Sequence, residues 1–388
     1  MELNGAVKGA VKGHLEGLGK EIVTLIGHSK HGKGDTYSPT CWSKNSEDVD
    51  VALRVIGAAS QSIHDGVTRL NLVYKANPSE VASESMSREM GGFCQQMVAS
   101  LTLLSSVGAS KSMVTYFSAG VRAVLHSLKD LIGALLDPSR HARLNGLTGT
   151  VWQSCTELQQ APKTNKLACR RQMMQWSVAV KDTIDEFVEA AKAAAMANAG
   201  TSESAGDKGG LDEQFAAKVT VGGAEEGEEG AEGTFDDFDF DGMDENYAAA
   251  ELPCVEASVD VLRVFRRCLK AANDSLNSLD SPEPQEESGA TAGSVGEGWL
   301  QGKLEWAKSV QTHLDDANEC AGEVGILLYP PLDGGELLGR ANDLEKSLAA
   351  FCEVFYACGE GRNSEMESPL RKAVVEKLGV LRAALEKL

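Results

Sequence analysis

Residues 150–168 read TVWQSCTELQQAPKTNKLA, and a long segment with helical periodicity follows them to Asn198. In that segment apolar side chains recur at steps of three and four residues, which places them on one face of a helix. The residues before it differ, because a tryptophan, a cysteine and a proline precede a Thr-Asn pair and Lys166. Helical periodicity does not call for such residues, so this junction is the most distinctive part of the sequence. The apolar face of the long segment consists of Met173, Trp176, Val180, Ile184, Phe187 and Ala191.

The same periodicity extends over most of the chain and predicts an all-α fold. Ser79 and Ser110 can each cap the start of a helix, and Asp137-Pro138 ends one. No segment alternates in the manner of a strand. Long helices with heptad-like seams indicate antiparallel helical bundles. The predicted helices cover residues 1–27, 45–75, 79–107, 110–136, a short stretch around Trp152, 166–198, 253–279, 300–328, 336–358 and 369–388.

Two segments without helical periodicity divide the chain. Residues 199–246 are rich in Gly, Ser, Glu and Asp and have too little apolar surface to offset the entropy of ordering. We therefore predict a disordered acidic linker there. Residues 281–298 are rich in Pro, Glu, Gly and Ser and form a second predicted flexible loop. The expected organisation is an N-terminal helical bundle over residues 1–198 and a C-terminal bundle over residues 247–388.

The charge balance argues against several classes of partner. The chain of 388 residues has 37 basic and 57 acidic side chains and a formal net charge of −20. Nucleic-acid phosphate and anionic membranes attract clustered Lys and Arg. The densest group of basic residues in this chain is confined to one helical stretch, residues 263–270. We therefore expect no direct nucleic-acid binding. No apolar run approaches the roughly 20 residues of a membrane span, so we expect no membrane insertion.

The cysteines indicate the redox environment. They are odd in number, nine in all, and no two have the Cys-x-x-Cys spacing of a metal site or a redox motif. Most occupy apolar helical positions, which favours reduced, buried thiols over a disulfide framework. We expect an intracellular protein of the cytoplasm and nucleus.

Two loops resemble known ligand sites but lack essential residues. Residues 27–33, GHSKHGK, match most of a phosphate-binding loop, but Gly34 stands where a hydroxyl is required and no helix follows. Residues 237–242, DFDFDG, match the start of a calcium loop, but Ala248 stands where the bidentate Glu should be. The histidines are scattered, and no catalytic Ser-His-Asp or Cys-His arrangement is indicated. The sequence therefore predicts a non-enzymatic protein with no cofactor and no bound metal.

Three features admit both a functional and a structural interpretation. Residues 235–240, FDDFDF, can dock as a peptide in a partner groove or simply solubilise the linker. Trp152 can contact a partner or pack at the end of a bundle. Residues 329–331, YPP, can contact a partner or stop a helix, because a residue before proline is pushed out of the helical region.

The chain resembles the cyclin-D1-binding protein 1 family, also called GCIP, in three blocks that follow the family's order. The first block is residues 151–168, VWQSCTELQQAPKTNKLA, continued by residues 178–190, VAVKDTIDEFVEA. The second is residues 252–262, LPCVEASVDVL, with residues 268–270, CLK, and the third is residues 327–332, LLYPPL. The acidic linker falls between blocks, where that family has one too.

The resemblance implies a non-enzymatic, two-domain protein with helical bundles similar to those of vinculin, α-catenin and talin. It also implies binding to D-type cyclins and helix-loop-helix transcription factors, with negative regulation of the cell cycle and of transcription. A vinculin-type cytoskeletal or adhesion scaffold is the alternative, and it rests on bundle architecture alone. The residues predicted to contact a partner are Trp152, Pro162, Asn165, Lys166, Tyr329, Pro330 and Pro331.

Overall fold

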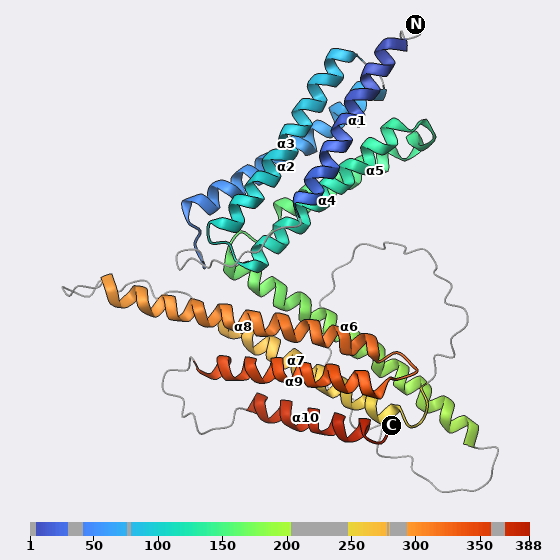
Figure 1. Cartoon of the computed structure of the whole chain (residues 1–388), viewed down its shortest axis with the longest axis vertical. Helices are drawn as coiled ribbons and strands as arrows, with labels where there is room; N and C mark the ends of the chain where they lie inside the picture. Colours follow the sequence, from blue (N-terminus) through green and yellow to red (C-terminus); the bar gives the residue numbers. More distant parts are fainter. Residues whose placement is uncertain are drawn as a thin grey trace, which may run out of the picture. The chain divides into compact units, whose positions relative to one another are not determined.

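The computed structural model describes residues 5–29, 42–75, 79–202, 247–277, 279, 293–357 and 369–388. Within these ranges the chain forms ten α-helices and a short 3₁₀ helix, and it has no strand (Figure 1). The all-α prediction is confirmed. The helices are α1 (Gly5–His28), α2 (Glu47–Lys75), α3 (Glu80–Ser106), α4 (Lys111–Leu136), η2 (Pro138–Arg143), α5 (Leu144–Gln159), α6 (Asn165–Ser202), α7 (Leu252–Asn277), α8 (Gly293–Leu327), α9 (Gly334–Ala357) and α10 (Pro369–Leu385).

The predicted capping residues lie at helix ends. The Ser79 hydroxyl accepts a hydrogen bond from the Ala82 amide at the start of α3, and the Ser110 hydroxyl does the same for Met113 at the start of α4. These bonds satisfy amides that have no partner within the helix. Asp137 follows the last residue of α4, and Pro138 begins η2, so the predicted helix end there is confirmed.

The helix boundaries differ from the prediction at two places. α6 continues to Ser202, four residues beyond its predicted end at Asn198. α8 begins at Gly293, so the predicted loop 281–298 is wrong over residues 293–298. Neither segment contains a proline, and adding a residue to an existing helix costs much less than nucleating one. Residues 203–246 of the predicted linker and residues 281–292 of the predicted loop lie outside the described residues.

The chain divides into two compact units, and neither is continuous in sequence. α6, α7, α8 and α9 each contribute residues to both units. The predicted division into bundles 1–198 and 247–388 stays a prediction. Unit 1 consists of Met1–Val178, Arg267–Asp315 and Ala350–Met366, and unit 2 consists of Ala179–Arg266, Asp316–Ala349 and Glu367–Leu388.

The main core of unit 1 is enclosed by α1 to α5, which lie side by side (Figure 1). α1 lies against α3 and α4, α2 against α3 and α5, and α4 against α5. The short turn between α3 and α4 makes these two helices antiparallel neighbours, as in a helical bundle. The apolar stripes predicted from periodicity face this core, which includes Ile22, Ile56, Ile63, Leu70, Met90, Met97, Leu104, Phe117, Val124, Leu128 and Leu131.

The core of unit 2 is built from the C-terminal half of α6, the start of α7, the end of α8, most of α9 and all of α10. Two phenylalanines of this core, Phe187 and Phe265, are among the largest fully buried side chains. The other buried apolar positions follow the predicted helical stripes. They include Val180, Ile184, Val255, Val259, Leu262, Leu337, Leu344, Leu348, Val374, Leu378 and Leu381.

The cysteines among the described residues are free thiols, and all of these except Cys320 are buried. Burial, together with the nearby Glu21 carboxylate, raises the pKa of the Cys94 thiol to about 12. Burial also raises the pKa of Cys155 to about 11. Because the thiolate is the reactive form, both groups stay protonated and inert at neutral pH.

We expect iodoacetamide at mildly alkaline pH to leave Cys94 and Cys155 unmodified in the folded protein, because both thiols are buried and remain protonated. Concentrated urea should make both reactive, since an unfolded thiol titrates near its ordinary pKa. Peptide mass spectrometry of the alkylated protein measures both states. Modification of either cysteine in the folded protein at the rate seen in urea would contradict this burial.

Candidate partner-binding surfaces

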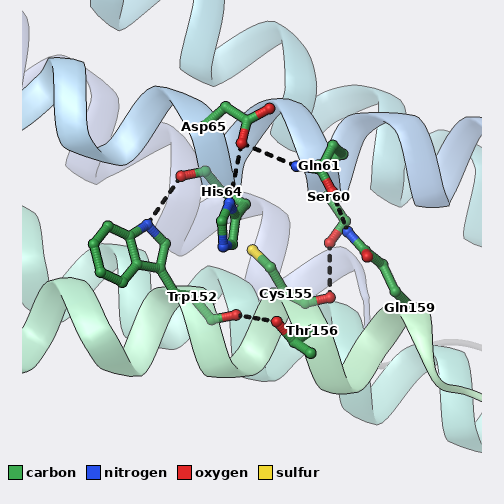
Figure 2. A network of polar contacts seen from close by, with 8 residues as sticks. All are labelled: Ser60, Gln61, His64, Asp65, Trp152, Cys155, Thr156 and Gln159. Carbon is green, nitrogen blue, oxygen red and sulfur yellow. Dashed lines mark hydrogen bonds and ion pairs between the residues drawn. The ribbon is translucent and has the colours of Figure 1, made fainter.

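Trp152 lies on α5 and is fixed against α2. Its indole Nε1–H donates a hydrogen bond to the His64 carbonyl at 3.0 Å, and the two rings lie 5.8 Å apart in a tilted arrangement (Figure 2). The side chain is nevertheless 38% exposed. Trp152 is therefore an aromatic side chain held in one orientation and partly presented to solvent, which is the form that many interface anchors take.

A chain of polar contacts beside Trp152 joins α2 to α5 (Figure 2). The Asp65 carboxylate accepts from the Gln61 amide at 2.9 Å and lies 3.1 Å from His64 Nδ1. The hydrogen bond with His64, followed by that with Gln61, lowers the pKa of Asp65. Gln61 in turn accepts from Gln159 at 3.0 Å. These bonds hold the two helices in register and preorganise the surface that carries Trp152.

Asn165 begins α6, and its side chain is buried. The amide Oδ1 accepts from the Ser110 backbone N–H at 2.6 Å, and Nδ2 donates to the Gly108 carbonyl at 3.0 Å. Gly108 has a positive φ of 99°, which favours glycine in this turn between α3 and α4. The hydroxyl of Thr164 accepts from the Leu167 amide and caps α6. Asn165 therefore fastens the start of α6 to the α3–α4 turn.

Lys166 is buried at the same junction. Its backbone N–H donates to the Trp42 carbonyl at 3.0 Å, and its ammonium donates to the carbonyl of Asn277, the last residue of α7, at 3.0 Å. A cation is favourable beside the unpaired carbonyls of a helix C-terminus. Pro162 is also buried. Direct partner contact by Pro162, Asn165 and Lys166 stays a prediction, while in this structure the side chains of Asn165 and Lys166 hold the junction together.

We expect Asn165→Ala to lower the free energy of unfolding by about 2–4 kcal/mol, because two buried backbone groups lose their hydrogen-bond partner. Urea denaturation followed by circular dichroism measures the change. Asn145→Ala on the exposed side of α5 is the matched control, and it should stay within about 0.5 kcal/mol of the unmodified protein. Equal effects of the two substitutions would show that the amide of Asn165 does not support the junction.

α6 carries an exposed apolar stripe that was not predicted from the sequence. Leu167, Met174 and Val178 are 51%, 58% and 57% exposed, and their spacing of seven and four residues places them on one side of the helix. We call these three residues the α6 stripe. It lies on a different side of α6 from the buried Met173. These apolar residues recur at helical spacing in the sequence, so the stripe could have been predicted. Only the apolar face that packs into the core was predicted.

Tyr329, Pro330 and Pro331 form the turn between α8 and α9 in unit 2. The Tyr329 hydroxyl donates to a Glu186 carboxylate oxygen on α6 at 2.5 Å, and its ring meets the Phe187 ring edge-on at 5.2 Å. Tyr329 is 55% exposed, and the Pro330–Pro331 peptide bond is cis. The turn does end α8, as the structural interpretation required, while partner contact here stays a prediction.

The segment directly before α7 holds this turn in place. The Glu251 carboxylate, which is buried, accepts from the Leu332 backbone N–H at 2.8 Å and from the Ala248 N–H at 2.7 Å. The buried Tyr247 hydroxyl donates to the Leu328 carbonyl at 2.8 Å. Residues directly before the second sequence block therefore contact the third block, which their separation in the chain did not reveal.

The predicted contact residues are distributed over both units. Pro162, Asn165 and Lys166 gather at the α5–α6 junction, whereas Trp152 occupies the solvent side of α5. The Tyr329 turn belongs to unit 2 and the other predicted residues belong to unit 1.

Clustered metal ligands and membrane-spanning helices are both absent among the described residues. In those ranges, no group of three or more His, Cys, Asp or Glu side chains is placed to hold a metal ion. The acidic residues 237–242 fall outside them. None of the described helices combines the length and the apolar character that crossing a membrane requires.

A family comparison connects this geometry to known proteins. Residues 55–193 match the family described as Grap2 and cyclin-D-interacting, N-terminal. The matched range extends from α2 into α6 and contains Trp152, the α5–α6 junction and the α6 stripe. It does not include the Tyr329 turn. The resemblance noted in the sequence is confirmed. A comparison with curated proteins finds no match to the chain.

Proposed function

We propose that this chain, whose residues 55–193 belong to the Grap2 and cyclin-D-interacting N-terminal domain family, is a non-enzymatic protein-binding regulator. It binds D-type cyclin, helix-loop-helix transcription factors, or both. By occupying them in the cytoplasm and nucleus, it restrains cell-cycle progression and transcription. The observation that carries the proposal is the family match, which covers the part of the chain with the partly exposed Trp152 and the α6 stripe.

The α6 stripe supports binding of a helix from a partner. Its three apolar side chains are each more than half exposed, although burial from water would be favourable for all of them. Their spacing along α6 matches the apolar seam by which an amphipathic partner helix docks. Cyclins and helix-loop-helix domains are themselves helical, so they can offer such a face.

The charge of the chain supports a negative role toward DNA-binding partners. Helix-loop-helix factors hold DNA through basic helices that extend from a dimer of two chains. This chain has a formal net charge of −20, so a complex that contains it in place of one partner repels DNA phosphate. Sequestration of the factor is then the physical basis of repression.

The proposal predicts direct binding of the purified full-length chain to a D-type cyclin or to a helix-loop-helix dimerisation domain. Isothermal titration calorimetry with each partner measures the affinity. Apolar burial at the interface should give a negative heat-capacity change. Binding to neither partner would refute the proposal, and co-sedimentation with F-actin in its place would favour a cytoskeletal scaffold.

Variants of the matched domain test the surface. We expect Trp152→Ala and Met174→Glu each to weaken the complex by about 2 kcal/mol or more, as truncation or charging of an interface anchor does. Met196→Glu is the matched control, because Met196 is an exposed methionine on the same helix beyond the matched residues. If Met196→Glu weakens binding as much as Met174→Glu, the α6 stripe is not the contact surface.

A further inference from the structure

Unit 2 contains a groove between α6, α7 and α10, with a cavity volume of about 870 Å³. The buried side chains of Phe187, Val255 and Val259 line its base. Its apolar lining extends outward to Val380 on α10, which is largely exposed. We call this feature the α6–α7–α10 groove.

Short side chains keep the groove open. Ala191 and Ala195 line it from α6, and Ala383 and Ala384 line it from α10. Alanine covers little of the helix surface, so these stretches of the two helices leave room between them for other apolar side chains. The groove is thus an apolar site with space for bulky anchors from elsewhere.

Basic side chains outnumber acidic ones around the groove, although the whole chain is strongly acidic. Lys192 on α6 and Lys387, two residues after the end of α10, line it, and both side chains are exposed. The exposed Glu256 on α7 lines the groove as well. Asp260 also lines the groove, but its carboxylate is engaged by Lys377 at 3.0 Å and by Arg263 at 2.9 Å. The groove therefore suits a ligand with apolar anchors and an acidic flank.

The chain leaves and re-enters the described structure beside this groove. α6 runs from Ala195, in the groove, to its last residue Ser202. Residues 203–246 lie outside the described ranges, and the chain resumes at Tyr247, three residues before the groove residue Ala250. The Asn198 amide donates to the Tyr247 carbonyl at 3.5 Å, which ties the two ends together. The intervening segment is thus tethered to the groove at both ends.

We propose that residues 235–240, FDDFDF, dock in the α6–α7–α10 groove of their own chain. The three phenylalanines supply the apolar anchors, and the aspartates between them face Lys192 and Lys387. The tethered segment has no Lys or Arg after Lys218, so nothing in its latter half opposes that charge match. This inference goes beyond the proposed function and does not depend on the identity of an external partner.

The tether is long enough for this docking. Six residues lie between Phe240 and Tyr247, and the seven Cα-to-Cα steps that join the two residues span at most about 25 Å when extended. The part of α7 that lines the groove, from Leu252 to Arg263, is only about 17 Å long at helical rise. A ligand held by so short a connection has an effective concentration in the millimolar range, so even weak contacts keep the groove occupied.

A fluorescein-labelled synthetic peptide of residues 233–245 is the probe, and its anisotropy is measured with the full-length chain. In one variant Phe235→Ala, Phe238→Ala and Phe240→Ala are combined, which removes the anchors of the tethered copy. If that copy fills the groove about nine-tenths of the time, the variant binds the probe about tenfold more tightly than the unmodified chain.

Groove variants are made in the background of the triple phenylalanine variant. Ala191→Glu places a carboxylate in the groove and should weaken probe binding at least about tenfold through like-charge repulsion and lost space. Ala193→Glu is the matched control, because Ala193 is exposed on the same helix and does not line the groove. Lys192→Gln with Lys387→Gln alters only exposed side chains, and it should weaken binding and reduce its salt dependence.

Each result decides the proposal. Tighter probe binding by the triple phenylalanine variant, lost with Ala191→Glu and kept with Ala193→Glu, supports it. Equal affinity of the unmodified chain and the triple phenylalanine variant overturns it, as does an absence of probe binding to either. The chain could instead self-associate without binding the probe, and Ala191→Glu could abolish that self-association. This result overturns the proposal and identifies a second copy of the chain as the occupant of the groove.

Discussion

The buried amide of Asn165 is the interaction on which the arrangement of this protein depends. Its oxygen and nitrogen satisfy the Ser110 amide and the Gly108 carbonyl in the turn between α3 and α4. A buried backbone group without a partner costs more than an ordinary hydrogen bond contributes, so this turn and the first residue of α6 are bound to one another. Lys166 adds a charged contact to the end of α7, and the direction in which α6 leaves α5 follows from these bonds.

α6 then serves several purposes along its length. Up to Val178 it belongs to unit 1, where one side carries Met173 into the interior and another carries the α6 stripe. Beyond that point it belongs to unit 2, where Phe187 is buried and Ala191 lines the groove. A helix repeats its faces every few residues, so one continuous element can present a core side, a contact side and a groove wall.

The lysines at the groove are placed differently from other lysines on the surface. The chain repels other anions as a whole, and lysines such as Lys181 and Lys346 are paired with carboxylates. Lys192 and Lys387 are placed instead at the edge of an apolar groove. Exposed ion pairs contribute little free energy, whereas charges that border an apolar site give orientation and specificity to whatever enters it.

The sequence by itself determined the helices, the stripes that face each core, the caps at Ser79 and Ser110, and the family of residues 55–193. These features are local, because helix periodicity, capping and short motifs need only neighbouring residues. Tertiary structure decided which of the distinctive residues are accessible: Asn165 and Lys166 are buried, whereas Trp152 remains partly exposed. It also decided the discontinuous units and the groove, because both arise from residues that the chain separates widely and only packing brings together.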